Sequence, residues 1–431
     1  MSDREASRRH PGTVGEVFRV FLRLGLTSFG GPVAHLGYFR EAFVARRKWL
    51  DDDAYADLVA LCQFLPGPAS SQVGMAIGLQ RAGYGGLLAA WFAFTMPSAV
   101  LLVAFAYGFD ALGDALGTGW LAGVKAAAVA IVAGAVLGMA KSLTPDARRA
   151  TIAGLAAIIV LLIPSPAIQL LAIAVGAALG LAWVRTPDTA GPASQPSPAE
   201  ADAAGASSAD SSSSAATADA APTGFRVPVS RRAGAAALTV CAALLLVLPA
   251  LSALTGDPAV RLAEIFSRAG ALVFGGGHVV LPLLETETVR TGLVDHDTFL
   301  AGYGAAQAVP GPLFTFAAFL GASTTSGPSG ILGASIALIA IFLPAALLTI
   351  GALPFWQRLH SSVHARRALL GVNAAVVGLL GAALFDPVFI EGVTSPATLA
   401  IAIAAFIALT RWNVPAWAVV LTAALIGWIA L

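Results

Sequence analysis

Four glycine- and proline-rich clusters interrupt apolar stretches of this sequence and are its strongest candidates for chemistry. They are Phe29-Gly30-Gly31-Pro32, Gln63-Phe64-Leu65-Pro66-Gly67-Pro68, Phe274-Gly275-Gly276-Gly277 and Gln307-Ala308-Val309-Pro310-Gly311-Pro312. Glycine and proline cannot continue a helix through hydrocarbon without freeing backbone groups, so such clusters must be buried in protein or line a polar cavity. A half-helix that begins after Pro32, Pro68 or Pro312 presents unpaired N–H groups and the positive end of its dipole, which suits a small anion.

Nearby side chains extend this candidate anion site. Lys125 lies in an otherwise uncharged apolar run, where an ionisable group costs at least about 2.5 kcal/mol and is a functional candidate. Arg23, Arg81 and Arg268 are further candidate cations. The predicted substrate-binding residues are Gly30, Gly31, Pro32, Gln63, Pro66, Gly67, Pro68, Ser70, Ser71, Lys125, Gly275, Gly276, Gly277, Gln307, Pro310, Gly311, Pro312 and Thr315.

Each of these features also has a purely structural interpretation. Glycines and prolines are common packing and kink residues in membrane helices, and Lys125 could extend to the bilayer interface. His35 and His278 are either proton carriers or packed histidines, and Asp51-Asp52-Asp53 is most simply an acidic helix start. The sequence has no Walker A, HExxH, GxSxG or CxxC motif, so we predict no catalytic residue, metal or cofactor.

The composition places the clusters in a membrane. Of the 431 residues, 57% are hydrophobic and 11% are charged, whereas a soluble chain averages roughly 25% charged residues. Apolar stretches of about 20 residues recur along the chain, which is the spacing of a helical bundle. The net charge of +1 gives no basic field for nucleic acid. We therefore expect an all-α polytopic membrane protein with about 10–13 membrane segments.

The clusters belong to an internal repeat. The paired motifs are offset by 245 and 244 residues, while Pro97 matches Pro344 at 247 and Lys125 matches Asn373 at 248. Six segments precede a single extra segment at 233–254, and six follow it. Because an odd number of crossings then separates the copies, we expect two inverted-topology repeats of broken or re-entrant helices.

The expected organisation follows from this repeat. It comprises a cytoplasmic tail (1–13), a first repeat (14–184), a disordered linker of Ala, Ser and Pro (185–232), a connecting transmembrane helix (233–254) and a second repeat (255–431). The positive-inside rule places the N-terminus and the linker in the cytoplasm. Arg40, Arg46, Arg47 and Lys48 obey that rule only if the first two segments are re-entrant hairpins.

The order of these motifs resembles the chromate ion transporter family in its long, two-domain form. The resemblance rests on Gly25-Leu26-Thr27-Ser28 before the first cluster, on Arg46-Arg47-Lys48-Trp49, and on the paired Pro-Gly-Pro motifs. It implies a secondary transporter, an antiporter that uses the proton-motive force to export chromate across the bacterial inner membrane and confers chromate resistance. Sulfate is the expected look-alike substrate.

Other functions remain open at this point. An exporter or channel for sulfate or another oxyanion would need the same residues. A membrane-embedded enzyme acting on a lipid would need an acidic or histidine cluster near the bilayer surface, for which Asp51–Asp53 is a weak candidate. The expected partners are a small oxyanion and the lipid bilayer; nucleic acid is not expected, and a homodimer is left open.

Overall fold

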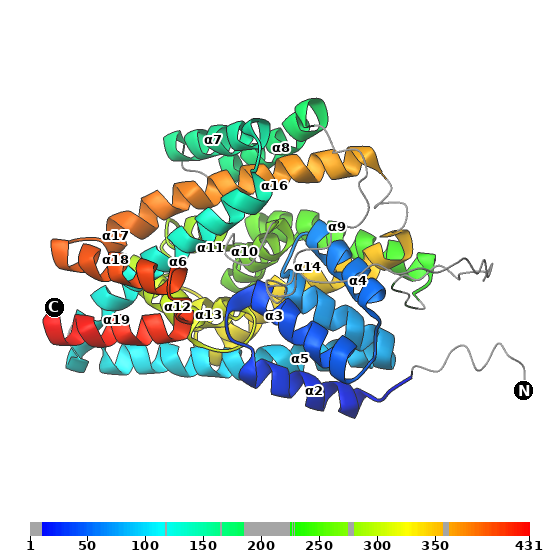
Figure 1. Ribbon diagram of the computed structural model, residues 1–431, viewed down its shortest axis with the longest axis horizontal. Helices are drawn as coiled ribbons and strands as arrows, with labels where there is room; N and C mark the ends of the chain where they lie inside the picture. Colours follow the sequence, from blue (N-terminus) through cyan, green and yellow to red (C-terminus); the bar gives the residue numbers. More distant parts are fainter. Residues whose placement is uncertain are drawn as a thin grey trace, which may run out of the picture.

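The computed structural model describes residues 11–116, 119–163, 166–184, 225, 227, 229–274, 280–356 and 362–431. Every regular element among these residues is helical (Figure 1). Five helices are long and apolar enough to cross a membrane: Ala69–Phe109, Gly119–Leu143, Arg231–Thr255, Gly330–Phe355 and Val363–Gly392. The prediction of an all-α polytopic membrane protein is confirmed. Residues 1–10 of the predicted tail and almost all of the predicted linker lie outside the described residues.

The two halves of the chain contain the same succession of helices. The first half has α2 (Val14–Thr27), α3 (Gly31–Arg40), α4 (Asp52–Phe64), α5 (Ala69–Leu116), α6 (Gly119–Leu143), α7 (Ala147–Leu162) and α8 (Pro166–Trp183). After α9 (Arg231–Thr255), the second half has α10 (Pro258–Leu272), α11 (Val280–Thr288), α12 (His296–Ala308), α13 (Phe316–Ala322), α14 (Gly330–Ala352), α16 (Val363–Ala383), α18 (Pro396–Thr410) and α19 (Ala416–Ala430). The motif repeat thus extends to whole elements.

Short helical turns complete both halves. They are η1 (Glu41–Arg46), η3 (Leu313–Thr315), η4 (Leu353–Phe355), η5 (Leu384–Phe389) and α17 (Ile390–Gly392). Equivalent helices also begin in the same way: the Asp51 carboxylate accepts from the Ala54 N–H at the start of α4, and Asp295 accepts from Thr298 N–H at the start of α12. Asp51 is therefore a helix cap, as the sequence indicated.

The broken helices of the first half form hairpins whose ends meet. The Gly12 N–H, just before α2, donates to the Arg81 carbonyl at 3.0 Å. The Arg81 guanidinium pairs with Glu16 at 3.1 Å and lies 4.7 Å from the ring centroid of Trp49, which follows η1. At Ala82 and Gly83, α5 leaves helical geometry and folds back on itself. We call the end of the molecule marked by Gly12, Trp49 and Arg81 the first-repeat end.

The second half repeats this arrangement at the opposite end. The Thr325 N–H, after α13, donates to the Leu293 carbonyl, after α11, at 2.9 Å. A Cβ on Gly327 would lie 2.6 Å from Pro258, the first residue of α10. A Cβ on Gly330 would lie 2.6 Å from the Tyr107 hydroxyl on α5. Tyr107 is 24 residues beyond Gly83, or roughly 36 Å along a helix, so this second-repeat end faces away from the first.

These hairpins explain how the basic residues between the first two segments can obey the positive-inside rule. The segment containing Arg40, Arg46, Arg47 and Lys48 ends at Trp49, beside Arg81 and the start of α2. All of these basic residues therefore lie at one end of the molecule. The paired hairpins, entering from opposite ends, are the arrangement expected of inverted repeats.

We expect opposite sidedness of the two ends in a cell membrane. In a chain with Cys62 and Cys241 replaced by alanine, Ala45→Cys and Ser326→Cys should react with a membrane-impermeant maleimide from opposite faces. Both positions are exposed, at the first-repeat end and the second-repeat end respectively. Labelling intact spheroplasts and inverted vesicles measures this. Reaction of both cysteines from the same face would contradict the inverted arrangement.

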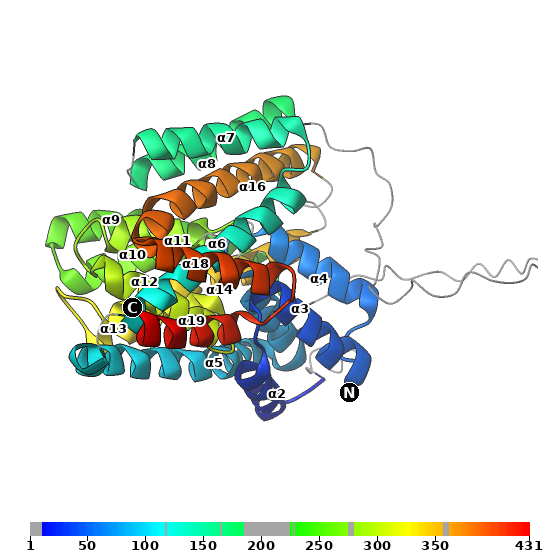
Figure 2. The same ribbon diagram turned by 60° about the vertical axis from the view of Figure 1, so that its left-hand side comes forward.

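The C-terminal hairpin of each half packs on the other half. Helices α7 and α8 lie along α16, and α18 and α19 lie along α6 (Figures 1 and 2). Small residues permit the close approach: a Cβ on Gly371 would lie 2.0 Å from the Gly176 carbonyl, and one on Gly123 would lie 2.0 Å from the Ala423 carbonyl. This exchange ties the repeats into one body.

Candidate functional site

The four helix breaks meet through two equivalent hydrogen bonds between the repeats. The Gly67 N–H, between α4 and α5, donates to the Val273 carbonyl after α10 at 2.7 Å. The Gly311 N–H, between α12 and η3, donates to the Ser28 carbonyl after α2 at 2.9 Å. Gly67 and Gly311 have φ of +117° and +105°, which side chains with a Cβ rarely adopt. These two amides are therefore engaged in hydrogen bonds between the repeats.

The first repeat surrounds this crossing with polar side chains. His35 on α3 is buried, with Nδ1 3.3 Å from Ser70 Oγ and Nε2 3.2 Å from the Ser28 carbonyl. Because a carbonyl only accepts, Nε2 of the neutral ring carries the proton and Nδ1 accepts from Ser70. The ring also packs edge-on against Phe94 at 5.3 Å between centroids. His35 thus connects the first break of this repeat to the second.

Several buried oxygens here have no hydrogen-bond partner among the described residues. They are the side-chain oxygens of Ser28, Ser71, Gln72 and Thr95. The Gln72 Nε2 donates to the Pro66 carbonyl at 2.9 Å, so its Oε1 alone is left over. Thr95 lies on α5 between Phe94 and Ser98, and Ser98 Oγ is the atom nearest to a Cβ placed on Gly311. Buried polar atoms are normally satisfied, so this group indicates a place for a polar ligand or water.

The start of α5 adds backbone donors to the same place. The first intrahelical bond of α5 runs from the Gln72 N–H to the Pro68 carbonyl at 2.9 Å. The N–H groups of Ala69, Ser70 and Ser71 precede it and have no partner within the helix. A helix N-terminus with three such groups favours negative charge. We use the name polar chamber for this set of buried polar side chains: Ser28, His35, Ser70, Ser71, Gln72 and Thr95.

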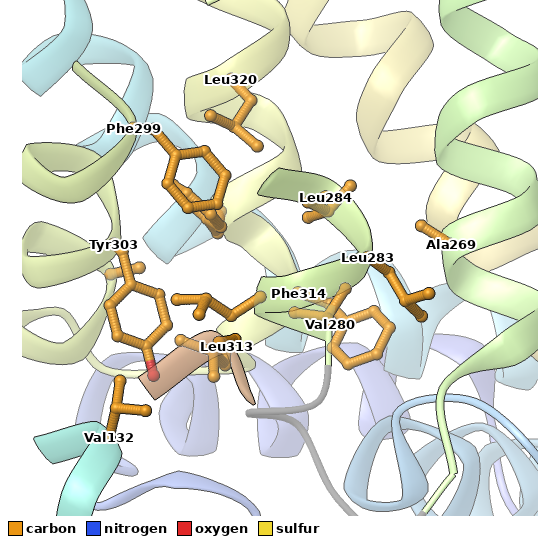
Figure 3. Packing of buried hydrophobic residues seen from close by; sticks show 14 of the residues in the cluster. Val132, Ala269, Val280, Leu283, Leu284, Phe299, Tyr303, Leu313, Phe314 and Leu320 are labelled. Carbon is orange, nitrogen blue, oxygen red and sulfur yellow. The ribbon is translucent and has the colours of Figure 1, made fainter. Parts of the chain in front are cut away.

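The second repeat fills the equivalent positions with apolar residues. Val280, Phe314, Phe316 and Phe342 stand where the first repeat has His35, Ser70, Gln72 and Thr95. All four belong to one buried cluster, and Figure 3 shows Val280, Leu313 and Phe314 within it. Thr315, equivalent to Ser71, donates its hydroxyl hydrogen to the Pro312 carbonyl at 2.7 Å. The backbone is therefore nearly symmetric while the chemistry of the chamber is one-sided.

The structure brings together only some of the predicted residues. Pro66, Gly67, Pro68, Ser70 and Ser71 lie at the chamber, and Gly30, Gly31 and Pro32 form the break that leads into α3. Gln63 is exposed, whereas Gln307 is half-buried. Pro310, Gly311 and Pro312 form the equivalent break of the second repeat. Gly275, Gly276, Gly277 and His278 lie outside the described residues.

The candidate cations are exposed or engaged in ion pairs. Arg23 is exposed on α2, Arg81 pairs with Glu16, and Arg268 pairs with Glu264 at 3.2 Å and Glu287 at 2.8 Å. Lys125 forms an ion pair with Asp297 at the start of α12. Asp297 is roughly 16 Å along α12 from the break at its far end. The Lys125 ammonium therefore pairs with a carboxylate at the start of α12 and not with a group at the breaks.

Two chamber residues, Gln72 and Thr95, can be recognised in the sequence only by comparing the two repeats. Gln72 directly follows Ser70 and Ser71, and Thr95 is a single polar residue in an apolar run, so neither stands out in the sequence on its own. Comparing equivalent positions of the repeats would have found them, since Ala-Ser-Ser-Gln after Pro68 stands against Leu-Phe-Thr-Phe after Pro312. A polar set that replaces aromatic residues at one of two equivalent breaks is hard to explain by packing.

We expect Lys125 and Asp297 to act as a pair. If the ammonium serves this ion pair, Lys125→Ala and Asp297→Ala should alter transport to similar extents, and the double variant should be no worse than either single variant. If the ammonium binds the substrate, Lys125→Ala alone should raise the half-saturating concentration. Initial rates over a range of substrate concentrations, at matched expression, distinguish these results. Additive effects of the two single variants would contradict the pair.

Fold and chamber together define an integral membrane protein with a polar chamber at crossed helix breaks. Sequence comparison gives the particular family: the profile of the family described as Chromate transporter matches residues 15–181 and 260–428. The chain belongs to this family, in its two-repeat form. Both repeats, including all four breaks, lie within or beside the matched ranges.

Relatives resemble the chain over most of its length. It is 28% identical to the chromate transport protein of Pseudomonas aeruginosa, over 97% of this chain and 93% of that protein. It is 25% identical to the chromate transport protein of Cupriavidus metallidurans, over 86% of this chain and 82% of that protein. An uncharacterized transporter of Methanocaldococcus jannaschii is 22% identical over 88% of this chain. No solved structure matches the chain.

Proposed function

We propose that this protein exports chromate from the cytoplasm across the bacterial inner membrane, coupled to the proton-motive force, and thereby confers chromate resistance. The observation that carries the proposal is the polar chamber, which combines buried hydroxyls without a partner among the described residues with three backbone N–H groups at the start of α5. Chromate is a tetrahedral dianion, and such donors replace the water molecules that hydrate its oxygens. The full-length similarity to two proteins named for chromate transport supports this substrate.

The proposed direction follows from charge and voltage. The first-repeat end, which carries Arg40, Arg46, Arg47, Lys48 and Arg81, is assigned to the cytoplasm by the positive-inside rule. A membrane potential that is negative inside favours loss of an anion by about 2.3 kcal/mol per charge per 100 mV. A dianion gains twice that amount, so voltage alone helps export.

The second candidate is an exporter of sulfate or another oxyanion. Sulfate shares the charge and the tetrahedral shape of chromate, and nothing in a set of hydroxyl and N–H donors selects by the central atom. Relatives named only as transporters are compatible with such a substrate. The family resemblance nevertheless favours chromate.

Uptake of labelled chromate into inverted vesicles tests the proposal. We expect saturable uptake that depends on this protein, that is stimulated by an imposed proton-motive force, and that excess sulfate inhibits only weakly. Vesicles containing a chain with Gly67→Val serve as the inactive control. Uptake of sulfate in preference to chromate would establish the second candidate instead, and uptake of neither would overturn the proposal.

A further inference from the structure

A buried carboxyl group in the second repeat has no equivalent in the first. Glu285 on α11 corresponds to Arg40 on α3. Arg40 is 62% exposed and pairs with an exposed aspartate, Asp52, at 2.6 Å. The Glu285 side chain is only 7% exposed. A buried carboxylate is far more expensive than an exposed one unless it is closely paired, so its partners decide what it does.

The partners of Glu285 are few and distant. Arg290 Nε lies 3.7 Å from Glu285 Oε1, and the same guanidinium lies 3.9 Å from Asp386 Oδ2. The Thr286 hydroxyl lies 3.3 Å from Glu285 Oε2. One arginine is thus shared by two carboxylates, and neither contact has the length of a strong charge-assisted hydrogen bond. This group carries a net charge of −1 when every member is ionised, and one added proton neutralises it.

Two other carboxylates of the second repeat form shorter ion pairs than Glu285 does. Arg268 contacts Glu264 at 3.2 Å and Glu287 at 2.8 Å. Exposed Arg261 at the start of α10 adds a second positive charge near these two carboxylates. With Arg261 included, this group has two arginines for two carboxylates, although Glu264 Oε1 forms no hydrogen bond among the described residues. Glu285 differs because it shares its single arginine with a second carboxylate.

A small, partly open cavity adjoins Glu285. It has a volume of about 20 Å³, which is room for a single water molecule. Its polar lining is Gln169, Glu285, Thr286, Arg290 and Asp386, and the residues contributed by α7 and α16 are apolar: Val160, Leu161, Leu379, Ala382 and Ala383. Asp386 is half exposed, so it connects this cavity to the surface.

The side-chain amide oxygen of Gln169 indicates that the cavity holds a hydrogen-bond donor. Gln169 on α8 is 4% exposed and lines the cavity. Its Nε2 donates to Thr286 Oγ1 at 2.7 Å, and its Oε1 has no partner among the described residues. A buried acceptor beside a buried carboxylate calls for a donor. A protonated carboxyl or a water that delivers the proton is such a donor.

We propose that Glu285 is a proton-binding site of this protein, reached from the second-repeat end through Asp386 and one water. The carboxylate takes a proton from a hydronium ion at the cavity, which forms the O–H bond of the carboxylic acid and leaves water. Glu285 lies on the half-helix that follows the break containing Val273, whose carbonyl accepts from Gly67 beside the polar chamber. We expect gain or loss of the proton to affect the chamber through α11. Its role in coupling rests on the proposed function, whereas proton binding itself does not.

Infrared difference spectroscopy of the full-length protein in lipid tests proton binding directly. Across a pH titration we expect a carboxylic acid C=O band that appears on acidification, is absent in Glu285→Gln and persists in Glu41→Gln. Glu41 is an exposed carboxylate of the first repeat that pairs with Arg46, so it is the matched control. Glu285→Asp should restore a band with a shifted midpoint. An unchanged band in Glu285→Gln would overturn the proposal.

Proteoliposomes containing a trapped pH dye test the consequence for transport. A chromate gradient should move protons in the wild type and in Glu41→Gln but not in Glu285→Gln, while exchange of labelled for unlabelled chromate persists in all three. Coupled proton movement at the wild-type ratio in Glu285→Gln would overturn the assignment. Absence of chromate exchange in the wild type would instead count against the proposed function and leave the infrared result standing.

Discussion

Replacing Gly67 or Gly311 by valine should strongly impair transport while the protein still inserts into the membrane. Both glycines have φ above +100°, a conformation that costs a residue with a Cβ on the order of 1–3 kcal/mol. A Cβ on Gly67 would lie 3.1 Å from Ala345 and Gln72, and one on Gly311 would lie 2.8 Å from Ser98 Oγ. Because each amide joins one repeat to the other, the strain falls on the crossing itself. We expect transport to fall by at least about tenfold.

Gly37→Ala is the matched control for these glycine substitutions. Gly37 lies within α3, and a Cβ there would meet no heavy atom within 4 Å. Alanine also favours the helix by roughly 1 kcal/mol. Initial rates of chromate uptake, normalised to the amount of protein in the membrane, measure the comparison. Wild-type transport by Gly67→Val or Gly311→Val would show that the hydrogen bonds between the repeats do not organise the site.

Ser71→Ala should weaken substrate affinity far more than Thr315→Val. The two residues are equivalent in the repeats, and both are buried. The Ser71 hydroxyl has no partner among the described residues, whereas the Thr315 hydroxyl donates to the Pro312 carbonyl. A hydroxyl that donates to a charged ligand contributes about 1.5 to 3 kcal/mol, so its loss should raise the dissociation constant roughly 10- to 150-fold.

Equilibrium binding to purified protein separates this effect from folding. Thr315→Val removes a satisfied hydroxyl from the apolar side of the crossing and should leave affinity within about threefold of wild type. Melting temperature measured in the same detergent reports any loss of stability. Equal losses of affinity in both variants would mean that the ligand lies on the pseudosymmetry axis and not in the first-repeat chamber.

The polar chamber is built from the first repeat alone, although the two repeats have nearly the same backbone. Inverted repeats allow a protein to exchange inward-facing and outward-facing states by interchanging the conformations of its halves. A ligand held by the first repeat alone moves with that repeat. The second repeat instead carries the buried carboxylates Glu264 and Glu285. The two proposals therefore place anion binding and proton binding in different halves of the protein.

The breaks, the repeat and the membrane environment could be predicted from the sequence because they depend on local chemistry. Glycine and proline interrupt a helix wherever they occur, and low charge excludes a water-facing surface. The hairpins at residues 14–79 were also inferable, since only a re-entrant path reconciles Arg40 to Lys48 with the other basic residues. Each of these inferences needs only residues that are close together in the chain or equivalent between the repeats.

Only the tertiary structure decided which groups meet. Gly67 bonds to Val273 and Lys125 pairs with Asp297, 172 residues away, because the repeats exchange hairpins and cross at their breaks. Helical periodicity says which face of a helix is apolar but not which element covers it. Glu285 and Arg40 therefore occupy equivalent positions, yet one is buried beneath α8 and α16 and the other is exposed. Burial and pairing depend on contacts between distant segments, which local sequence does not encode.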